Sequence, residues 1–302
     1  MSNRVATASG SSLKSGKKRL SDMLLLAAIY ISAVLSVVLL AGIIGYVFFK
    51  GFRMLSSEFF TSTPSVLKGT VGIAGNLVNT LYIVLITLLI ATPVGVGSAI
   101  YLNEYAKPGK LVKVLEFTTE TLSGIPSVIF GLFGMVFFGN TFGLSYSILT
   151  GALTLSLMVL PLITRNTQEA LRTVPYSYRS GALGIGATKW YMIRTILLPS
   201  AMPGIVTGII LALGRIIGES AALLFTAGSG YDLIRFGSDF GTNLEKIGEK
   251  TLQSGGTLTV QLYLYMSKGE YEAAFGIGCV LLVIALFLNV LTKLVARRFR
   301  KV

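Results

Sequence analysis

Long apolar runs separated by polar stretches dominate the pattern of this chain. The first run, Met23–Phe49, contains no charged residue, and its 27 residues would reach about 40 Å as a helix. That length crosses a bilayer with some tilt. Five further apolar runs follow, at residues 77–102, 121–138, 146–164, 202–224 and 273–295. The pattern predicts an all-α, polytopic integral membrane protein with six transmembrane helices.

The two ends of the chain differ from the apolar runs. Residues 1–21 are basic and rich in Ser and Gly, and such a segment cannot bury enough apolar area to become ordered, so we expect a flexible tail. Residues 22–50 are predicted to form a retained first helix, because the apolar core of a cleaved signal peptide is shorter. Residues 296–302 add a short basic C-terminus.

One connection, at residues 169–205 between the fourth and fifth predicted helices, has an unusual composition. Small residues come first, and aromatic and basic residues follow. Pro175 suits the first turn of a helix, where its missing N–H would have no partner anyway. Pro199 and Pro203 are expected to stop and restart the chain. We therefore predict a short helix, a small-residue turn and a second short helix at the membrane surface.

The placement of positive charge predicts how the chain is oriented. Six crossings put both termini on one side of the membrane, and 18 of the 26 Lys and Arg residues fall on that side. Positive residues collect on the cytoplasmic side of membrane proteins, so both termini and the connection 169–205 are predicted to be cytoplasmic. The net charge of +13 is thus explained by membrane topology, and no nucleic-acid partner is expected.

Composition also excludes several kinds of chemistry. The chain has no His and a single Cys, Cys279. A His-based catalytic triad, a His-ligated metal and a disulfide within the chain are therefore impossible. No G-x-x-x-x-G-K-[ST] phosphate-binding loop is present. We expect no catalytic residue, no metal and no cofactor, and any ATP hydrolysis that drives this protein must occur in another subunit.

Two charged residues interrupt the fifth apolar run. Arg215 and Glu219 are four residues apart, so on one helix they would share a face and could pair. Each costs about 2.5–3.5 kcal/mol at the centre of a bilayer. One interpretation is a structural ion pair that locks two helices. The other is a site on an anion path, with Arg215 facing the substrate, Glu219 orienting it and Ser220 adding a hydrogen bond.

Arg165 and Glu169 repeat this spacing at the end of the fourth run. Arg165 is the second candidate for the anion path. The alternative is that its side chain extends to the lipid headgroups, as Arg side chains at the ends of spans often do.

The connection 169–205 carries a spaced motif that resembles a known family. Three small residues are followed at fixed intervals by a glycine and by an Ile-x-Leu-Pro group, and these positions are Ser180, Gly181, Ala182, Gly186, Ile196, Leu198 and Pro199. This spacing resembles the cytoplasmic coupling loop of ATP-binding-cassette (ABC) importer permeases, with its Glu-Ala-Ala, Gly and Ile-x-Leu-Pro pattern. Ser180 stands where the family usually has Glu, so the role of that carboxylate is not carried over to this chain.

The resemblance extends over residues 70–295. The segments 123–134, 179–205 and 214–228 are similar to the A-type permease of the bacterial high-affinity phosphate importer, a permease of the MetI-like (type I) class. This resemblance implies a six-span permease domain that moves inorganic phosphate across the cytoplasmic (inner) membrane by alternating access, without enzymatic activity of its own. It further implies a heterodimer with a second permease, two ATP-binding subunits at the loop and an external phosphate-binding protein. Arg215 and Arg165 would then lie near the phosphate path.

Other functions remain open at this point. The chain could serve an importer of another oxyanion, such as sulfate or molybdate, or could be the second permease of the same phosphate system. An ion-coupled secondary transporter usually has several intramembrane carboxylates, whereas Glu219 is the only acidic residue inside a predicted span. An intramembrane enzyme is disfavoured by the lack of acid–base candidates, and a channel or membrane scaffold is a further alternative.

Overall fold

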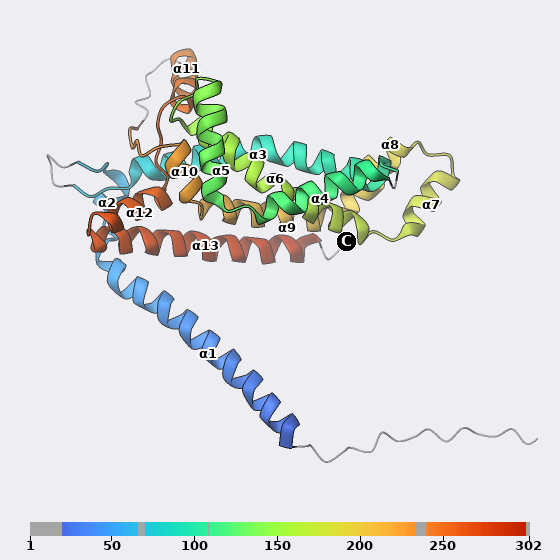
Figure 1. Cartoon of the computed structure of the whole chain (residues 1–302), viewed down its shortest axis with the longest axis horizontal. Coiled ribbons are helices and arrows are strands. Elements are labelled where there is room, and N and C mark those ends of the chain that lie inside the picture. The colour runs from blue at the N-terminus through green and yellow to red at the C-terminus, as the bar shows by residue number, and fades with distance from the viewer. Residues whose placement is uncertain (1–19, 66–69, 108, 234–239, 300–302) are drawn as a thin grey trace, which may run out of the picture. The chain divides into compact units, whose positions relative to one another are not determined.

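A computed structural model describes residues 20–65, 70–107, 109–233 and 240–299. The regular elements in these ranges are helices, together with one isolated bridge between Ser65 and Thr70 (Figure 1). The all-α prediction is therefore confirmed. The chain divides into two compact units, residues 1–46 and 47–302. Most of the predicted tail 1–21, and the last three residues of the basic C-terminus 296–302, lie outside the described residues.

The longest helices follow the apolar runs, and shorter helices connect them. The long helices are α1 (Leu20–Gly51), α3 (Ala74–Ile100), α6 (Ile148–Arg172), α9 (Leu198–Ile217) and α13 (Tyr271–Phe299). The shorter ones are η1 (Phe52–Met54), α2 (Ser57–Thr61), η2 (Tyr101–Tyr105), α4 (Lys110–Gly124), α5 (Ser127–Gly134), η3 (Met135–Thr141), α7 (Tyr176–Gly184), α8 (Lys189–Met192), η4 (Ile193–Leu197), α10 (Ala221–Thr226), α11 (Phe240–Thr251) and α12 (Leu258–Ser267). Of these, η2, η3 and η4 are π-helical.

Five segments in the described part of the chain are long and apolar enough to cross a membrane. They are residues 22–54, 74–105, 148–172, 189–217 and 271–295. A sixth crossing is obtained if α4 with α5 and η3 counts as one span. The first, second, fourth and sixth predicted spans therefore correspond to continuous helices, whereas the third and fifth predictions need correction.

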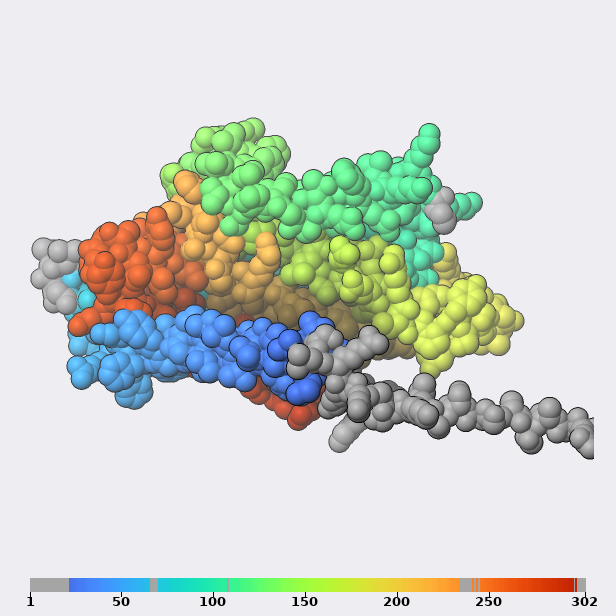
Figure 2. Space-filling view, turned by 60° about the horizontal axis from the view of Figure 1, so that its bottom comes forward, coloured from blue at the N-terminus to red at the C-terminus, as the bar shows by residue number. Residues whose placement is uncertain are grey.

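The third predicted span, residues 121–138, is wrong as a single straight helix. The chain bends by 102° between α4 and the helical segment Ser127–Thr141. Pro126 causes the break, because it lacks an N–H and because Ile125 before it adopts an extended conformation. The polar residues before the predicted span are also helical from Lys110 onward. Figure 2 shows α4 and α5 (green) on the surface of the second unit.

The fifth predicted span, residues 202–224, has the wrong boundaries. The helical segment starts at Lys189 and runs through α8, η4 and α9 to Ile217. Pro199 does not stop the chain, because it comes just after the π-helical turn η4, and such local π adjustments accommodate a proline inside a membrane helix. Pro203 lies inside α9 without ending it, as prolines in membrane helices often do. The segment ends instead at Gly218, and α10 begins after a short break.

The core of the second unit forms where α3, α6 and α9 pack together. Side chains from all three contribute to one buried cluster, among them Ile83, Leu155, Ile163 and Ala212. Hydroxyl groups also join the helices, since Thr87 Oγ1 donates to the Ala152 carbonyl at 3.3 Å. Small and hydroxyl residues allow membrane helices to approach closely, which the packing here uses throughout.

A close contact between α5 and α10 gives a testable consequence. A Cβ atom added to Gly131 would lie 2.8 Å from Ala222 Cα, whereas one added to Gly124 in α4 would meet no atom within 4 Å. We expect Gly131→Ala to lower the thermal unfolding temperature of the detergent-solubilised protein, because backbone atoms cannot yield easily. Gly124→Ala, the matched control, should leave it equal or slightly raised, since Ala is favoured over Gly in helices by about 1 kcal/mol. Equal behaviour of the two variants would contradict this packing.

Candidate coupling segment and anion path

The coupling segment, residues 175–199, begins as the sequence predicts, with a short helix, a turn and a second short helix. Pro175 immediately precedes α7, and the turn 185–188 leads into α8. Thr188 caps α8, because its Oγ1 accepts a hydrogen bond from the backbone N–H of Tyr191 at 3.3 Å. In Figure 1, α7 and α8 lie at one end of the second unit, beyond the end of α6 that is predicted to face the cytoplasm.

The turn after α7 depends on Gly186. The Ala187 N–H donates to the Ala182 carbonyl and the Gly186 N–H donates to the Leu183 carbonyl, each at 3.0 Å. This pair of bonds is the Schellman arrangement, in which the residue after the helix cap adopts a left-handed conformation. Gly186 has a φ of +86°. Glycine occupies this conformation without the steric cost that a side chain would add, so the family position that the sequence singled out has a structural reason.

The two faces of the coupling segment differ sharply. Ala182 is buried against an apolar cluster that includes Leu171, Met192 and Leu197. Ile196 and Leu198 are partly buried against the same cluster, whereas Ser180, Gly181, Gly186 and Pro199 are exposed. On the outer face, Ile185 is 88% exposed and Trp190 is 59% exposed. These two apolar side chains are therefore accessible for contact with another molecule.

Ser180 does not reproduce the chemistry of the glutamate that the family usually has. Its hydroxyl donates to the carbonyl of Ser177 at 3.2 Å, within its own helix. A different carboxylate approaches α7 from another element. Arg179, the neighbour of Ser180, pairs with Glu104 of η2 at 2.8 Å between Nη2 and Oε1.

The Arg179–Glu104 pair is largely buried, and both side chains are held by further hydrogen bonds. The exposed fractions of the two side chains are 14% for Arg179 and 5% for Glu104. Arg179 also donates to the carbonyls of Val174 and Leu171, both at 2.9 Å, and Asn103 Nδ2 donates to the Glu104 carboxylate at 2.7 Å. The sequence analysis missed this pair, because the partners are 75 positions apart and nothing in their spacing connects them.

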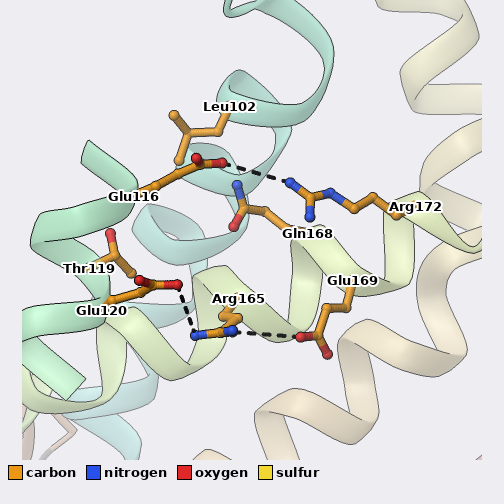
Figure 3. A pocket seen from close by; sticks show the side chains of 8 residues that line it. All are labelled: Leu102, Glu116, Thr119, Glu120, Arg165, Gln168, Glu169 and Arg172. Carbon is orange, nitrogen blue, oxygen red and sulfur yellow. Dashed lines mark ion pairs between the residues drawn. The ribbon is translucent and has the colours of Figure 1, made fainter. Parts of the chain in front are cut away.

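Arg165 lies in a charged recess between α4 and α6 (Figure 3). Its guanidinium is 3.6 Å from the Glu169 carboxylate, as the four-residue spacing suggested, and 3.5 Å from that of Glu120. Arg172 is 3.7 Å from Glu116 on the same two helices. These side chains are largely exposed, so the pairs are screened by salt and contribute little to stability. Arg165 is therefore held between two carboxylates.

The interpretation of Arg215 and Glu219 as a structural ion pair is wrong. Gly218 ends α9, so Glu219 does not continue the helix that carries Arg215. The Glu219 carboxylate instead accepts a hydrogen bond from the backbone N–H of Ala222 at 3.1 Å, at the start of α10, where negative charge is favoured. Its backbone carbonyl accepts from Thr259 Oγ1 at 2.7 Å.

The candidate path residues are consequently distributed over two places. Arg215 is exposed in the last turn of α9, and among the described residues no ion pair joins it to Glu219. Ser220 is partly buried at the start of α10, and its predicted hydrogen bond to a substrate stays a prediction. Arg165 belongs to the charged recess, whose lining does not include Arg215. Glu219 and Ser220 thus lie in the break between α9 and α10, and the Glu219 carboxylate does not pair with the guanidinium of Arg215.

Comparison with known proteins identifies the family of this chain. A model of the family described as "Binding-protein-dependent transport system inner membrane component" matches residues 91–301. The chain is 39% identical over 211 residues to a probable ABC transporter permease protein, YqgI, of Bacillus subtilis, covering 70% of this chain and 72% of that protein. It is 33% identical over 210 residues to the phosphate transport system permease protein PstA of Haemophilus influenzae, covering 70% and 74%.

Solved structures share the fold. A bacterial alginate ABC transporter, in complex with an alginate-bound periplasmic protein, contains a chain that matches with a TM-score of 0.65 at 16% identity, covering 92% of this chain and 95% of that one. The inward-facing MetNI methionine ABC transporter matches with a TM-score of 0.54 at 19% identity, covering 76% and 94%. The chain therefore belongs to the family of binding-protein-dependent transport system inner membrane components, and it is a permease subunit of an ABC importer.

Proposed function

We propose that this permease moves inorganic phosphate into the cytoplasm, as one half of a heterodimer with a second permease. Relatives that carry the name phosphate transport system permease protein PstA support phosphate as the substrate. The proposed partners are two ATP-binding subunits and an external phosphate-binding protein. Both termini and the coupling segment are proposed to face the cytoplasm, which agrees with the distribution of Lys and Arg.

The observation that carries this proposal is that Glu219 does not neutralise the charge of Arg215. Its guanidinium lies at the end of an apolar helix, and the nearby Glu219 is engaged by α10 instead of neutralising it. Inorganic phosphate carries one to two negative charges, so a path through the membrane needs fixed positive charge. Arg suits this role because its planar guanidinium binds two oxygens of an oxyanion at once.

The proposed mechanism is alternating access driven from the coupling segment. ATP binding closes the partner ATPases, and the coupling segment, docked on them through Ile185 and Trp190, moves with them. The helical segment 189–217 begins with α8 and runs without a break into α9. Motion of α8 therefore reaches the end of α9, where Arg215 lies. The path opens outward, and hydrolysis returns it to the inward-open state.

Uptake of labelled phosphate tests the proposed substrate. The chain is co-expressed with its partner permease and ATP-binding subunits, purified in detergent and reconstituted into proteoliposomes together with the phosphate-binding protein. We expect the ATPase subunit to co-purify, phosphate to raise ATP turnover, and excess sulfate or molybdate to leave uptake unchanged. Uptake of sulfate or molybdate in preference to phosphate would assign the importer to another oxyanion. Uptake that needs an ion gradient but no ATP would contradict the proposal altogether.

A further inference from the structure

We propose that Arg179 and Glu104 are a positioning pair that fixes the coupling segment to the end of α3 that is predicted to face the cytoplasm. This inference rests on the proposed coupling function of residues 175–199. In the proposed coupling, motion of α7 is transmitted to the membrane-spanning helices by two routes. One is the continuous helix from α8 to α9, and the other is the Arg179–Glu104 contact.

The contact is built to hold α7 in one orientation. Arg179 places its Nη2 2.8 Å from Glu104 Oε1 and its Nε 3.2 Å from the same oxygen. The second Nη2 hydrogen goes to the carbonyl of Leu171, in the last turn of α6, and one Nη1 hydrogen goes to the carbonyl of Val174, which directly precedes the coupling segment. One guanidinium therefore joins three stretches of chain. A planar fork with five donors fixes such an arrangement, whereas a lysine ammonium could not reproduce it.

Burial distinguishes this pair from the other ion pairs of the described residues. Arg165 with Glu120, and Arg172 with Glu116, have side chains that are 45% exposed or more. Arg179 and Glu104 are far more buried, so loss of either partner leaves a buried charge without its counter-ion. Asn103 Nδ2 further holds the Glu104 carboxylate in place.

The receiving element is continuous with a membrane-spanning helix. Glu104 lies in η2, which extends α3 by one π turn, and residues 74–105 form one candidate span. A second contact joins the same turn to α8, since Lys189 Nζ lies 4.9 Å from the centre of the Tyr105 ring. α3 packs in the core against α6 and α9. A displacement of α7 is therefore transmitted to α3, as well as to α9.

Removal of either charge of the pair tests this inference in the reconstituted importer. We expect Arg179→Gln and Glu104→Gln to assemble with the ATPase subunit and hydrolyse ATP, but to transport about tenfold fewer phosphate ions per ATP, since changes along a coupling route alter coupling on this scale. The double variant Arg179→Glu with Glu104→Arg should not recover the lost coupling, because a carboxylate at position 179 cannot donate to the Leu171 and Val174 carbonyls. Arg179→Lys should stay impaired. Arg297→Gln removes an exposed arginine near the end of α13 and serves as the matched control, with normal coupling.

A distance measurement on the intact pair removes dependence on variants that fail to assemble. Spin labels are placed at Ser180→Cys on α7 and Lys107→Cys beyond η2, both exposed positions. We expect the distance between them to be the same in the nucleotide-free and ATP-bound importer, because the two elements move together. A distance that changes with nucleotide would overturn the inference, and so would normal coupling in the single variants. In either case, normal coupling in the wild type would leave the proposed function intact. Absence of phosphate-stimulated ATP turnover in the wild type would instead overturn the proposed function.

Discussion

Replacing Arg215 by Gln is expected to abolish phosphate uptake while leaving the importer assembled. The side chain is exposed at the end of α9, so its removal creates no cavity in the core and should not disturb packing. What is lost is the fixed positive charge for the anion. We expect uptake to fall by about a hundredfold or more, the scale of loss when one donor to an anion is removed from a preorganised site. Labelled phosphate uptake by proteoliposomes measures this effect.

Two further variants separate charge from geometry at this position. Arg215→Lys keeps the charge but loses the two-oxygen contact, so we expect partial uptake. Glu219→Gln keeps an acceptor for the Ala222 N–H, so assembly and stability should change little. Co-purification of the ATPase subunit must be equal in all of these variants. Normal uptake by the Arg215→Gln importer would remove this residue from the anion path.

Replacing Gly186 by Val is expected to uncouple ATP hydrolysis from transport. The backbone at this residue has a φ of +86°, and a Cβ there would meet no neighbouring atom within 4 Å. The cost is therefore conformational, about 1–2 kcal/mol for a side chain in the left-handed region. That cost opens the turn between α7 and α8 and changes the surface presented to the ATPase. ATP turnover with and without phosphate, measured beside uptake, reports the uncoupling.

Matched variants show whether the conformation of Gly186 is the cause. Gly186→Asn should retain more coupling than Val, because Asn tolerates positive φ. Gly181→Ala lies in the same short helix, where an added Cβ also meets no atom, but its φ is ordinary, so it should behave as the wild type. If the Val and Ala variants couple equally well, the turn is not the reason that a glycine occupies this position.

The sequence was sufficient for the features that depend on local pattern. Apolar runs of the right length predicted α1, α3, α6 and α13, because a membrane helix needs little more than a continuous apolar stretch. The small residues and prolines of the coupling segment predicted a helix, a turn and a second helix, since each of these residues acts within one or two turns. Arg165 with Glu169 likewise formed the pair that their four-residue spacing suggested.

Features that depend on contacts between distant segments were missed. The Arg179–Glu104 pair joins α7 to η2, and in the sequence Glu104 is one of several charges in a polar connection. Hydropathy alone also missed the bend in the third predicted span and misplaced both ends of the fifth. Pro126 broke a run that reads as apolar throughout. Pro199 and Pro203 broke nothing, because local π-helical turns and neighbouring helices accommodate a proline inside a membrane helix. Gly218 separated Arg215 from Glu219, which a period of 3.6 would have placed together.

The bend between α4 and α5 has a consequence for every segment on either side of it. An even number of bilayer passages between the N-terminal segment and Gly186 returns the chain to its starting compartment, and an odd number does not. The helices α1, α3 and α6 supply three passages, so the bent pair must supply the fourth for both positions to share a compartment. Accessibility labels at the N-terminus and at residue 186 are accordingly expected to react from the same side of sealed vesicles, with the 102° kink embedded between them.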